Sequence, residues 1–243
     1  MGHFCHLGFA MDDTPLQHSL FGDSTQRESP QKQRQAASTT KASDHVVRVE
    51  SIPIEDGTLT IHYNWLSSTE AVSMFEVLQQ QLAWEQSVIR VYGRQVAIPR
   101  LNAWYGDRGC QYSYSGYQLP LNPWHTQLQR LRQRLEGELG LQVNSALANL
   151  YRNGQDSVGW HSDDEPELGV DPTIASVSLG AQRDFHLKHR RNTSSSVVKL
   201  ALPAGSLLVM SGKIQRYWQH CLPKTKKVAE SRINLTYRHI KFK

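Results

Sequence analysis

The tripeptide His161-Ser162-Asp163 and the distant His220 are the residues of this chain whose types and spacing best suit chemistry. The residues before His161 are typical of an extended strand, in which side chains at i and i+2 point to the same side. His161 and Asp163 can therefore face one point, which His220 can complete. Two histidines and one carboxylate on one face hold non-haem Fe(II) and leave coordination positions open. The alternative for the tripeptide alone is a surface turn in which Asp163 is a cap.

A second chemical signal lies near the C-terminus, where residues 231–238 alternate polar with apolar as a half-buried strand does. Its polar residues then share one face: Arg232, Asn234, Thr236 and Arg238. Arginines that point into a protein are costly unless an anion meets them, and arginine recognises carboxylates in a bidentate way. Two such residues beside an iron would suit 2-oxoglutarate, a dicarboxylate that also chelates the metal. The alternative is a strand whose polar face is solvated.

Several motifs in a fixed order resemble those of one known family. They are Asn149–Tyr151, Gly159–Glu165, Ile174–Gly180, Arg183–Phe185, Gly205–Met210 and Arg232–Arg238. Together they resemble the AlkB family of nucleic-acid dealkylating dioxygenases. Upstream, Pro99-Arg100, Tyr105–Asp107 and Tyr112–Gly116 resemble the branch that includes the duplex-DNA repair homologues. The resemblance runs from Val88 to Ile240.

The resemblance implies oxidative demethylation of DNA bases such as N1-methyladenine and N3-methylcytosine, with release of formaldehyde, succinate and CO₂. It assigns Fe(II) to His161, Asp163 and His220. It places 2-oxoglutarate among Asn149, Tyr151, Arg232, Asn234, Thr236 and Arg238. Within that set it implies that Arg232 and Tyr151 hold the distal carboxylate, whereas Arg238 lies nearer the chelating end.

The expected substrate contacts come mostly from the same resemblance, and they are Tyr92, Arg100, Tyr112, Ser115, Asp164 and Glu165. A base methylated on its Watson–Crick nitrogen is positively charged, so the carboxylates of Asp164 and Glu165 would favour it. Tyr92 falls in a tight hairpin, where an aromatic ring can fill the space that a flipped base leaves. The alternative for Asp164 and Glu165 is a solvated acidic turn. The alternative for Tyr92 is an aromatic side chain that packs on the sheet of its own hairpin.

The expected fold is mostly β: a double-stranded β-helix, or jelly roll, buttressed by two N-terminal helices, with a nucleotide-recognition hairpin region. We expect one helix over 70–83, capped by Ser68 or Thr69, and another from Pro123 to about Gly140, capped by Asn122. Hairpins are expected over 46–63 and 88–98. Short strands are expected at about 145–151, 157–161, 173–179, 183–188, 196–201, 206–210, 216–220 and 231–239.

Composition sets further bounds on the chain. The 243 residues carry a formal net charge of +5, which is compatible with a phosphate-bearing partner. We expect one or two of three basic clusters to contact its backbone, and the alternative for each is a solvated face. The clusters are Arg130, Arg132, Arg134; Lys188, His189, Arg190, Arg191; and Lys224, Lys226, Lys227. No apolar run approaches a membrane span, and three scattered cysteines indicate a reducing compartment. We expect a monomer, cytoplasmic in a bacterium and nuclear in a eukaryote.

Residues 1–45 are predicted to be a disordered tail, followed by the catalytic domain over 46–243, because residues 26–43 are almost devoid of apolar side chains. Within the tail, Gln17, Ser19, Leu20 and Phe21 resemble the pentapeptide with which bacterial replication proteins bind the sliding clamp. A chance pentamer is the alternative.

Three other functions compete with DNA demethylation. The first is the same chemistry on RNA or single strands, and the second is an oxygenase for proteins or small molecules. The third is a non-catalytic adaptor that binds DNA and the clamp. The basic clusters and the tyrosine-rich segment 105–117 argue against the second. The complete His161, Asp163 and His220 set argues against the third.

Overall fold

The computed structural model describes residues 45–241 except 92, 111–112, 115–116 and 193. Three expected substrate residues, Tyr92, Tyr112 and Ser115, lie outside the described residues. So do the tail and its predicted clamp motif. The described residues belong to one compact unit of the chain, which spans residues 42–243.

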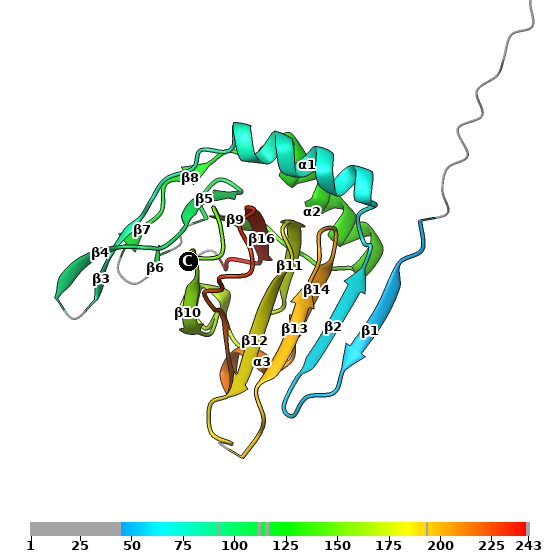
Figure 1. Cartoon of the computed structure of the whole chain (residues 1–243), viewed down its shortest axis with the longest axis vertical. Helices are drawn as coiled ribbons and strands as arrows, with labels where there is room; N and C mark the ends of the chain where they lie inside the picture. The colour runs from blue at the N-terminus through cyan, green and yellow to red at the C-terminus, as the bar shows by residue number, and fades with distance from the viewer. Residues whose placement is uncertain (1–44, 92, 111–112, 115–116, 193, 242–243) are drawn as a thin grey trace, which may run out of the picture. The chain divides into compact units, whose positions relative to one another are not determined.

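A large, mostly antiparallel sheet carries one half of the fold (Figure 1). Its strand order is β1-β2-β14-β11-β16-β9-β5-β8. The strands are β1 (Arg48–Ile52), β2 (Thr58–Tyr63), β14 (Leu207–Ser211), β11 (Ile174–Gly180), β16 (Arg232–Arg238), β9 (Ser145–Tyr151), β5 (Leu101–Gly106) and β8 (Leu121–Asn122). Only β5 and β8 pair in parallel.

A smaller sheet faces it and has the order β10-β15-β12-β13. Its strands are β10 (Val158–His161), β15 (Trp218–Leu222), β12 (Arg183–His189) and β13 (Val198–Leu202). Two short hairpins complete the strands: β3 (Val88–Val91) with β4 (Arg94–Ala97), and β6 (Ser113–Tyr114) with β7 (Tyr117–Gln118). In Figure 1 the β3–β4 hairpin projects away from the two sheets.

The alternation along β16 separates the core from the polar interior. Ile233, Leu235 and Tyr237 are fully buried in the cluster shared with the two long helices. Because successive side chains of a strand point to opposite faces, Arg232, Asn234, Thr236 and Arg238 face the space between the sheets, where they line one pocket. A second apolar cluster fills the rest of that space, with Leu208 from the large sheet and Leu187 from the small one.

Two helices, α1 (Ser68–Gln81) and α2 (Thr126–Leu139), cover the outer face of the large sheet. Ser67 caps α1 and forms a capping box with Glu70, so the predicted cap at Ser68 or Thr69 is one or two residues late. Ala71, Met74 and Leu78 are buried on the face that packs against the sheet, whereas Val72 is 57% exposed.

The second helix also starts elsewhere than predicted. His125, not Asn122, caps α2, since its Nδ1 accepts the Gln127 N–H. Asn122 instead ends β8, and its side chain donates to the Trp104 carbonyl. Gly140 closes α2 in the left-handed conformation at φ 64°, which favours glycine.

The predicted jelly roll is confirmed, and the expected strands from 145 to 239 are found within two residues of their predicted bounds. Strand β5 and the short helix α3 (Ile214–Tyr217) were not predicted. In the described part of the chain, no helix is long and apolar enough to cross a membrane.

Candidate functional site

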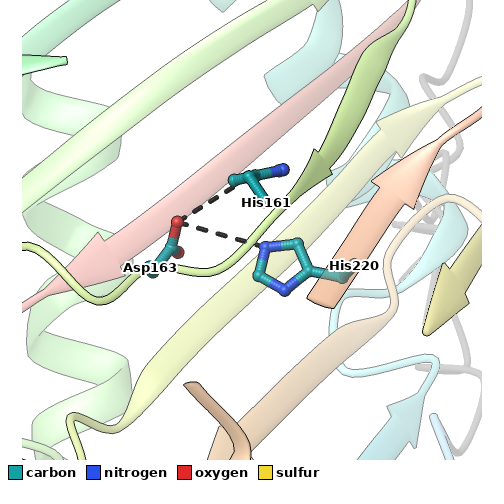
Figure 2. Close-up of side chains that lie close together, drawn as sticks. All are labelled: His161, Asp163 and His220. Carbon is teal, nitrogen blue, oxygen red and sulfur yellow. Dashed lines mark ion pairs between the residues drawn. The ribbon is translucent and has the colours of Figure 1, made fainter. Parts of the chain in front are cut away.

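His161, Asp163 and His220 meet between the two sheets, as Figure 2 shows. Their ligand atoms all lie within 4.8 Å of one another. The Oδ1 atom of Asp163 is 3.8 Å from Nε2 of His161 and 4.0 Å from Nε2 of His220. The two histidines face each other across the ladder between β10 and β15, where they form a register pair. One point can therefore contact all three side chains.

Hydrogen bonds and burial prepare these side chains for a cation. The Nδ1–H of His161 donates to the Gly159 carbonyl at 2.9 Å, which leaves the lone pair of Nε2 for a metal. Burial lowers the pKa of His220 to about 3, so its ring is neutral at pH 7. Burial alone would raise the pKa of Asp163, but Arg238 and the two histidines outweigh it and lower this pKa to about 2. The three residues thus present two imidazole nitrogens and one carboxylate, a donor set that fits Fe(II).

Two buried arginines flank this group, and they differ in their partners. Arg238 donates from Nε and an Nη to Oδ2 of Asp163, at 3.2 and 2.9 Å. Arg232 is 2% exposed, and within the described part of the chain it donates only to neutral oxygens of Ser178 and Asn234, each at 2.9 Å. Its Nε has no hydrogen-bond partner among the described residues. Burial lowers the pKa of Arg232 to about 10, so the buried guanidinium still carries its charge at pH 7.

A carboxylate beside Arg232 would supply the missing acceptor and the missing charge. Tyr151 lies close, with its ring centroid 5.6 Å from Cζ of Arg232. The same pocket contains the metal-ligand candidates and Arg238. A molecule with two carboxyl ends can therefore reach Arg232 and the metal point together, as 2-oxoglutarate requires.

Asn234 connects the other predicted cosubstrate residues. Its Oδ1 accepts from Ser176 and Arg232, and its Nδ2 donates to Oγ1 of Thr236 at 2.8 Å. Asn149 accepts from Nε of Arg100 at 2.9 Å. Arg100 was expected to bind substrate, yet it is buried and also donates to the Ser157 carbonyl. It lines the same pocket and joins the cosubstrate strand β9 to the segment that leads into β10.

The structure does not place Asp164 and Glu165 in the pocket. Asp164 is exposed and accepts from Arg190 at 3.0 Å. Glu165 is half-buried and precedes the short 3-10 helix η1 (Pro166–Leu168). A role in base recognition therefore remains a prediction for both. Residues that sequence reasoning missed include Phe185, which stacks on His220 with ring centroids 5.2 Å apart, and Gln215, which accepts the backbone N–H of Asp163.

The three basic clusters are not equivalent. The arginines of α2 all pair with carboxylates: Arg130 with Glu70, Arg132 with Asp107 and Glu136, and Arg134 with Glu138. His189 is buried and accepts two backbone N–H groups of its own turn. Lys224, Lys226 and Lys227 have no ion pair among the described residues and lie on an exposed loop.

That lysine loop is joined to the segment between β9 and β10. Gly154 donates to the Val228 carbonyl at 2.9 Å, and Thr225 donates to the Gly154 carbonyl at 2.8 Å. A Cβ on Gly154 would clash with both the Thr225 and Val228 carbonyl oxygens. Only glycine therefore allows this approach, which fixes the lysine loop beside the segment that carries His161.

Comparison with known proteins gives a consistent result. A family model for the 2OG-Fe(II) oxygenase superfamily matches residues 58–238. The DNA oxidative demethylase ALKBH2 of Homo sapiens is 39% identical over 180 residues, which cover 70% of this chain and 69% of the relative. The alpha-ketoglutarate-dependent dioxygenase alkB homolog 3 of Bos taurus is 43% identical over 179 residues, which cover 70% of this chain and 62% of the relative.

The ALKBH2 of Bos taurus is similar at 39% identity, and the match spans 65% of its length. The chain thus spans about two thirds of the length of these relatives. Among solved structures, OsALKBH1 superposes with a TM-score of 0.51 at 18% identity and covers 78% of this chain and 100% of that one. That likeness supports the fold alone.

Arg232 provides the first test of the site. Arg232→Ala should weaken 2-oxoglutarate binding by about 2–5 kcal/mol, because it removes a desolvated partner of a carboxylate. Calorimetry with the Mn(II)-loaded protein measures this directly. Arg216→Ala is the matched control, since Arg216 pairs with Asp171 on the surface and should leave the affinity unchanged. An unchanged 2-oxoglutarate affinity in Arg232→Ala would remove Arg232 from the site.

The buried His220 predicts how acid affects the metal-free protein. Its folded pKa of about 3 lies below the unfolded value, so the unfolded state binds more protons as the pH falls below about 6.5. Stability should therefore fall by about 2 kcal/mol between pH 7.5 and pH 5. The lowered pKa of Asp163 also makes the folded state less stable as the pH falls, but this loss occurs only between about pH 4 and about pH 2.

Urea unfolding of the chelator-treated protein at the two pH values measures this effect. His220→Gln removes the titrating group and should flatten the dependence. The same slope in both proteins would show that another group is responsible.

Proposed function

Because the chain belongs to the 2OG-Fe(II) oxygenase superfamily and, within it, to the AlkB family, we propose that it demethylates alkylated bases in DNA. The substrates that we infer are bases of the N1-methyladenine and N3-methylcytosine type. The observation that carries the proposal is one pocket in which His161, Asp163 and His220 lie beside the buried Arg232, which pairs with no carboxylate among the described residues. Fe(II) and 2-oxoglutarate, when bound, would supply the oxidising chemistry with O₂ as the oxidant, and the products would be succinate, CO₂ and formaldehyde.

The protein's own residues supply position and exclusion of water. His161, Asp163 and His220 would hold the metal, and Arg232 with Tyr151 would bind the far carboxylate of the cosubstrate. Arg238 keeps Asp163 ionised and oriented. His161 has a side chain that is 24% exposed, whereas the side chains of Asp163 and His220 are 3% and 4% exposed. A substrate base would thus approach from the side of His161.

Nucleic acid is the substrate class that the surface supports. The lysine loop at Lys224–Lys227 offers unpaired positive charge beside the segment that leads to His161. On the outer face of the small sheet, Lys188 lies 4.5 Å from the ring centroid of Trp160, which is 38% exposed. Basic side chains beside an exposed aromatic ring suit a phosphate backbone and its bases.

The strand preference is a finer proposal, and duplex DNA is the form that we favour. The β3–β4 hairpin is exposed at most described positions and projects from the sheets (Figure 1). An isolated two-stranded hairpin is only marginally stable in water. A projecting hairpin therefore contributes little to the stability of the fold, and this supports a binding role for it. Tyr92 follows β3 in the sequence and is outside the described residues; we propose that it fills the gap left by a flipped base. RNA or single-stranded DNA is the second candidate, since the same pocket accepts an unpaired base.

The tail supports one more proposal, which rests on sequence alone. Gln17, Ser19, Leu20 and Phe21 would tether the enzyme to a sliding clamp and raise its local concentration on newly copied DNA. Calorimetry with a peptide of residues 14–23 and a bacterial clamp tests it. No heat at high micromolar concentration would reduce the pentapeptide to a coincidence.

Turnover on methylated oligonucleotides tests the proposed function. Formaldehyde release should require Fe(II) and 2-oxoglutarate and should vanish in His161→Ala, which lacks one ligand. Tyr92→Ala should reduce the rate on duplex more than on single-stranded DNA, because stacking on a base is worth about 1–3 kcal/mol. If only methylated RNA is turned over, the RNA candidate replaces DNA. Equal losses on both DNA forms would assign Tyr92 to packing.

The lysine loop predicts a specific salt dependence. Lys226→Ala should reduce the slope of log affinity against log salt by about 1 for a methylated oligonucleotide, because one phosphate contact is lost. Arg130→Ala removes the same charge from α2, where Arg130 already pairs with Glu70, and should leave the slope unchanged. Fluorescence anisotropy at several salt concentrations measures both, and equal slopes in the two variants would contradict a phosphate contact at Lys226.

A further inference from the structure

Asp163 lies beyond the strand that carries its fellow ligand. Strand β10 ends at His161, and its ladder with β15 is irregular, with register pairs only at Val158 and His161. No ladder bond therefore fixes the backbone of Asp163. Its position must be set by contacts that the strand does not provide.

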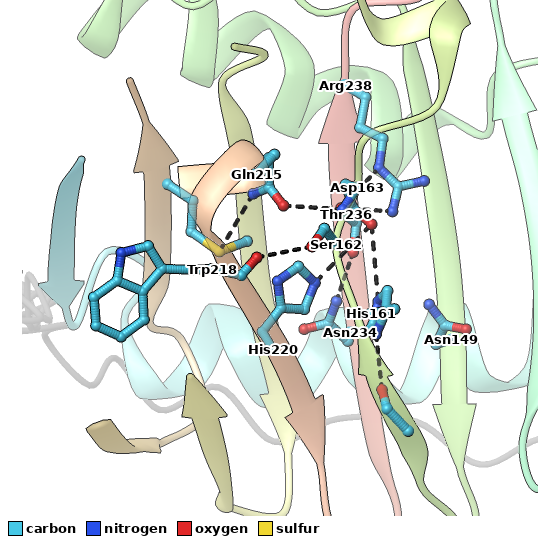
Figure 3. A network of polar contacts seen from close by, with 12 residues as sticks. Asn149, His161, Ser162, Asp163, Gln215, Trp218, His220, Asn234, Thr236 and Arg238 are labelled. Carbon is cyan, nitrogen blue, oxygen red and sulfur yellow. Dashed lines mark hydrogen bonds and ion pairs between the residues drawn. The ribbon is translucent and has the colours of Figure 1, made fainter. Parts of the chain in front are cut away.

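Residues 161–163 are called the ligand turn. Two hydrogen bonds join it to the segment that leads to His220, as Figure 3 shows. The hydroxyl of Ser162 donates to the Trp218 carbonyl at 2.8 Å. The backbone N–H of Asp163 donates to Oε1 of Gln215 at 2.9 Å. These bonds connect the first two ligands to the chain just before the third, with no contribution from the metal.

Gln215 itself is rigidly held. It is 1% exposed and stands on α3, next to the fully buried Ile214. A Cβ on Gly57 would clash with Ile214, so the β1–β2 turn lies directly against this helix. The indole N–H of Trp218 donates to the Glu55 carbonyl at 2.8 Å and ties the start of β15 to the same turn.

The environment also fixes which way the Gln215 amide faces. Its Nε2 lies 3.8 Å from the sulfur of Met210, a weak acceptor, while its oxygen receives the N–H of Asp163. A rotated amide would set two donors against each other. Gln215 does not line the pocket, so neither metal nor cosubstrate is within its reach. Its contact acts through Asp163.

We propose that Gln215, assisted by Ser162, is a positioning residue that holds Asp163 in metal-binding geometry before the metal arrives. A buried backbone N–H left without an acceptor is costly, so loss of the amide oxygen would let the ligand turn shift toward another partner. Partners of metal ligands commonly change metal affinity by about 10–100-fold. The inference rests on the metal role of the triad and not on the identity of the substrate.

Metal binding by the full chain provides the test, without nucleic acid. Gln215→Met keeps the length of the side chain and replaces the amide oxygen with a thioether, a much weaker acceptor. It should raise the Kd for Mn(II), measured by calorimetry on the chelator-stripped protein, by about tenfold or more. Gln219→Met is the matched control, because Gln219 stands on β15 beside His220 and its side chain makes no hydrogen bond to residues 161–163 in the described part of the chain. Its Kd should equal that of the wild type.

Spectra and a second pair of variants separate positioning from damage to the fold. The visible spectrum of the Co(II)-loaded protein should change in Gln215→Met and stay the same in Gln219→Met. Ser162→Ala should also weaken Mn(II) binding, and Ser162→Thr, which retains the hydroxyl, should restore it. At saturating Fe(II) the maximal turnover of Gln215→Met should approach that of the wild type.

Mn(II) affinity in Gln215→Met equal to that in Gln219→Met would overturn the proposal. If Gln215→Met does not fold, the Ser162 pair decides, and equal affinities in Ser162→Ala and Ser162→Thr would overturn it. Failure of demethylation on every oligonucleotide, with these metal affinities as expected, would contradict the proposed function and leave the positioning role intact.

Discussion

The contact between Asp163 and Arg238 is the interaction on which the rest of the site depends. Both side chains are almost fully buried, and the closest approach is 2.9 Å. A buried carboxylate without a partner would neutralise and lose its value as a metal ligand. Arg238 prevents this, and it can do so only because β16 places it in the interior, between the two sheets. The register of β16 with β9 and β11 is therefore a condition for the charge state of the ligand.

Strand β16 also shows how much of the site can be predicted from the sequence. Arg232, Asn234, Thr236 and Arg238 alternate with Ile233, Leu235 and Tyr237, and this two-residue period predicts both the shared polar face and the core face. The metal-ligand candidates were also predictable, because two histidines and an aspartate that can face one point are seldom needed together for structure alone. The pairing of Arg238 with Asp163 and of Arg100 with Asn149 was not predictable, because each joins residues far apart in the chain.

Other elements escaped prediction for identifiable reasons. Strand β5 is buried on both faces, with Tyr105 in one core cluster and Trp104 in the other, so it lacks the alternation of a half-buried strand. Helix α3 has four residues, too few for a helical period to show. The caps of α1 and α2 were misplaced because several polar residues compete at each start, and only the three-dimensional turn selects Ser67 and His125.

The glycine at position 154 has a consequence for how such a protein can change over time. Its backbone lies against the carbonyls of Thr225 and Val228, so the turn before β10 and the lysine loop after β15 meet at a contact that has no room for a side chain. An insertion between the contacting residues of either segment would disturb this contact and, through it, the segment that leads to His161. A change in what this surface contacts therefore disturbs the fold least when it exchanges side chains on the loop, such as those at 224, 226 and 227, because an exchange leaves the contact at the glycine intact.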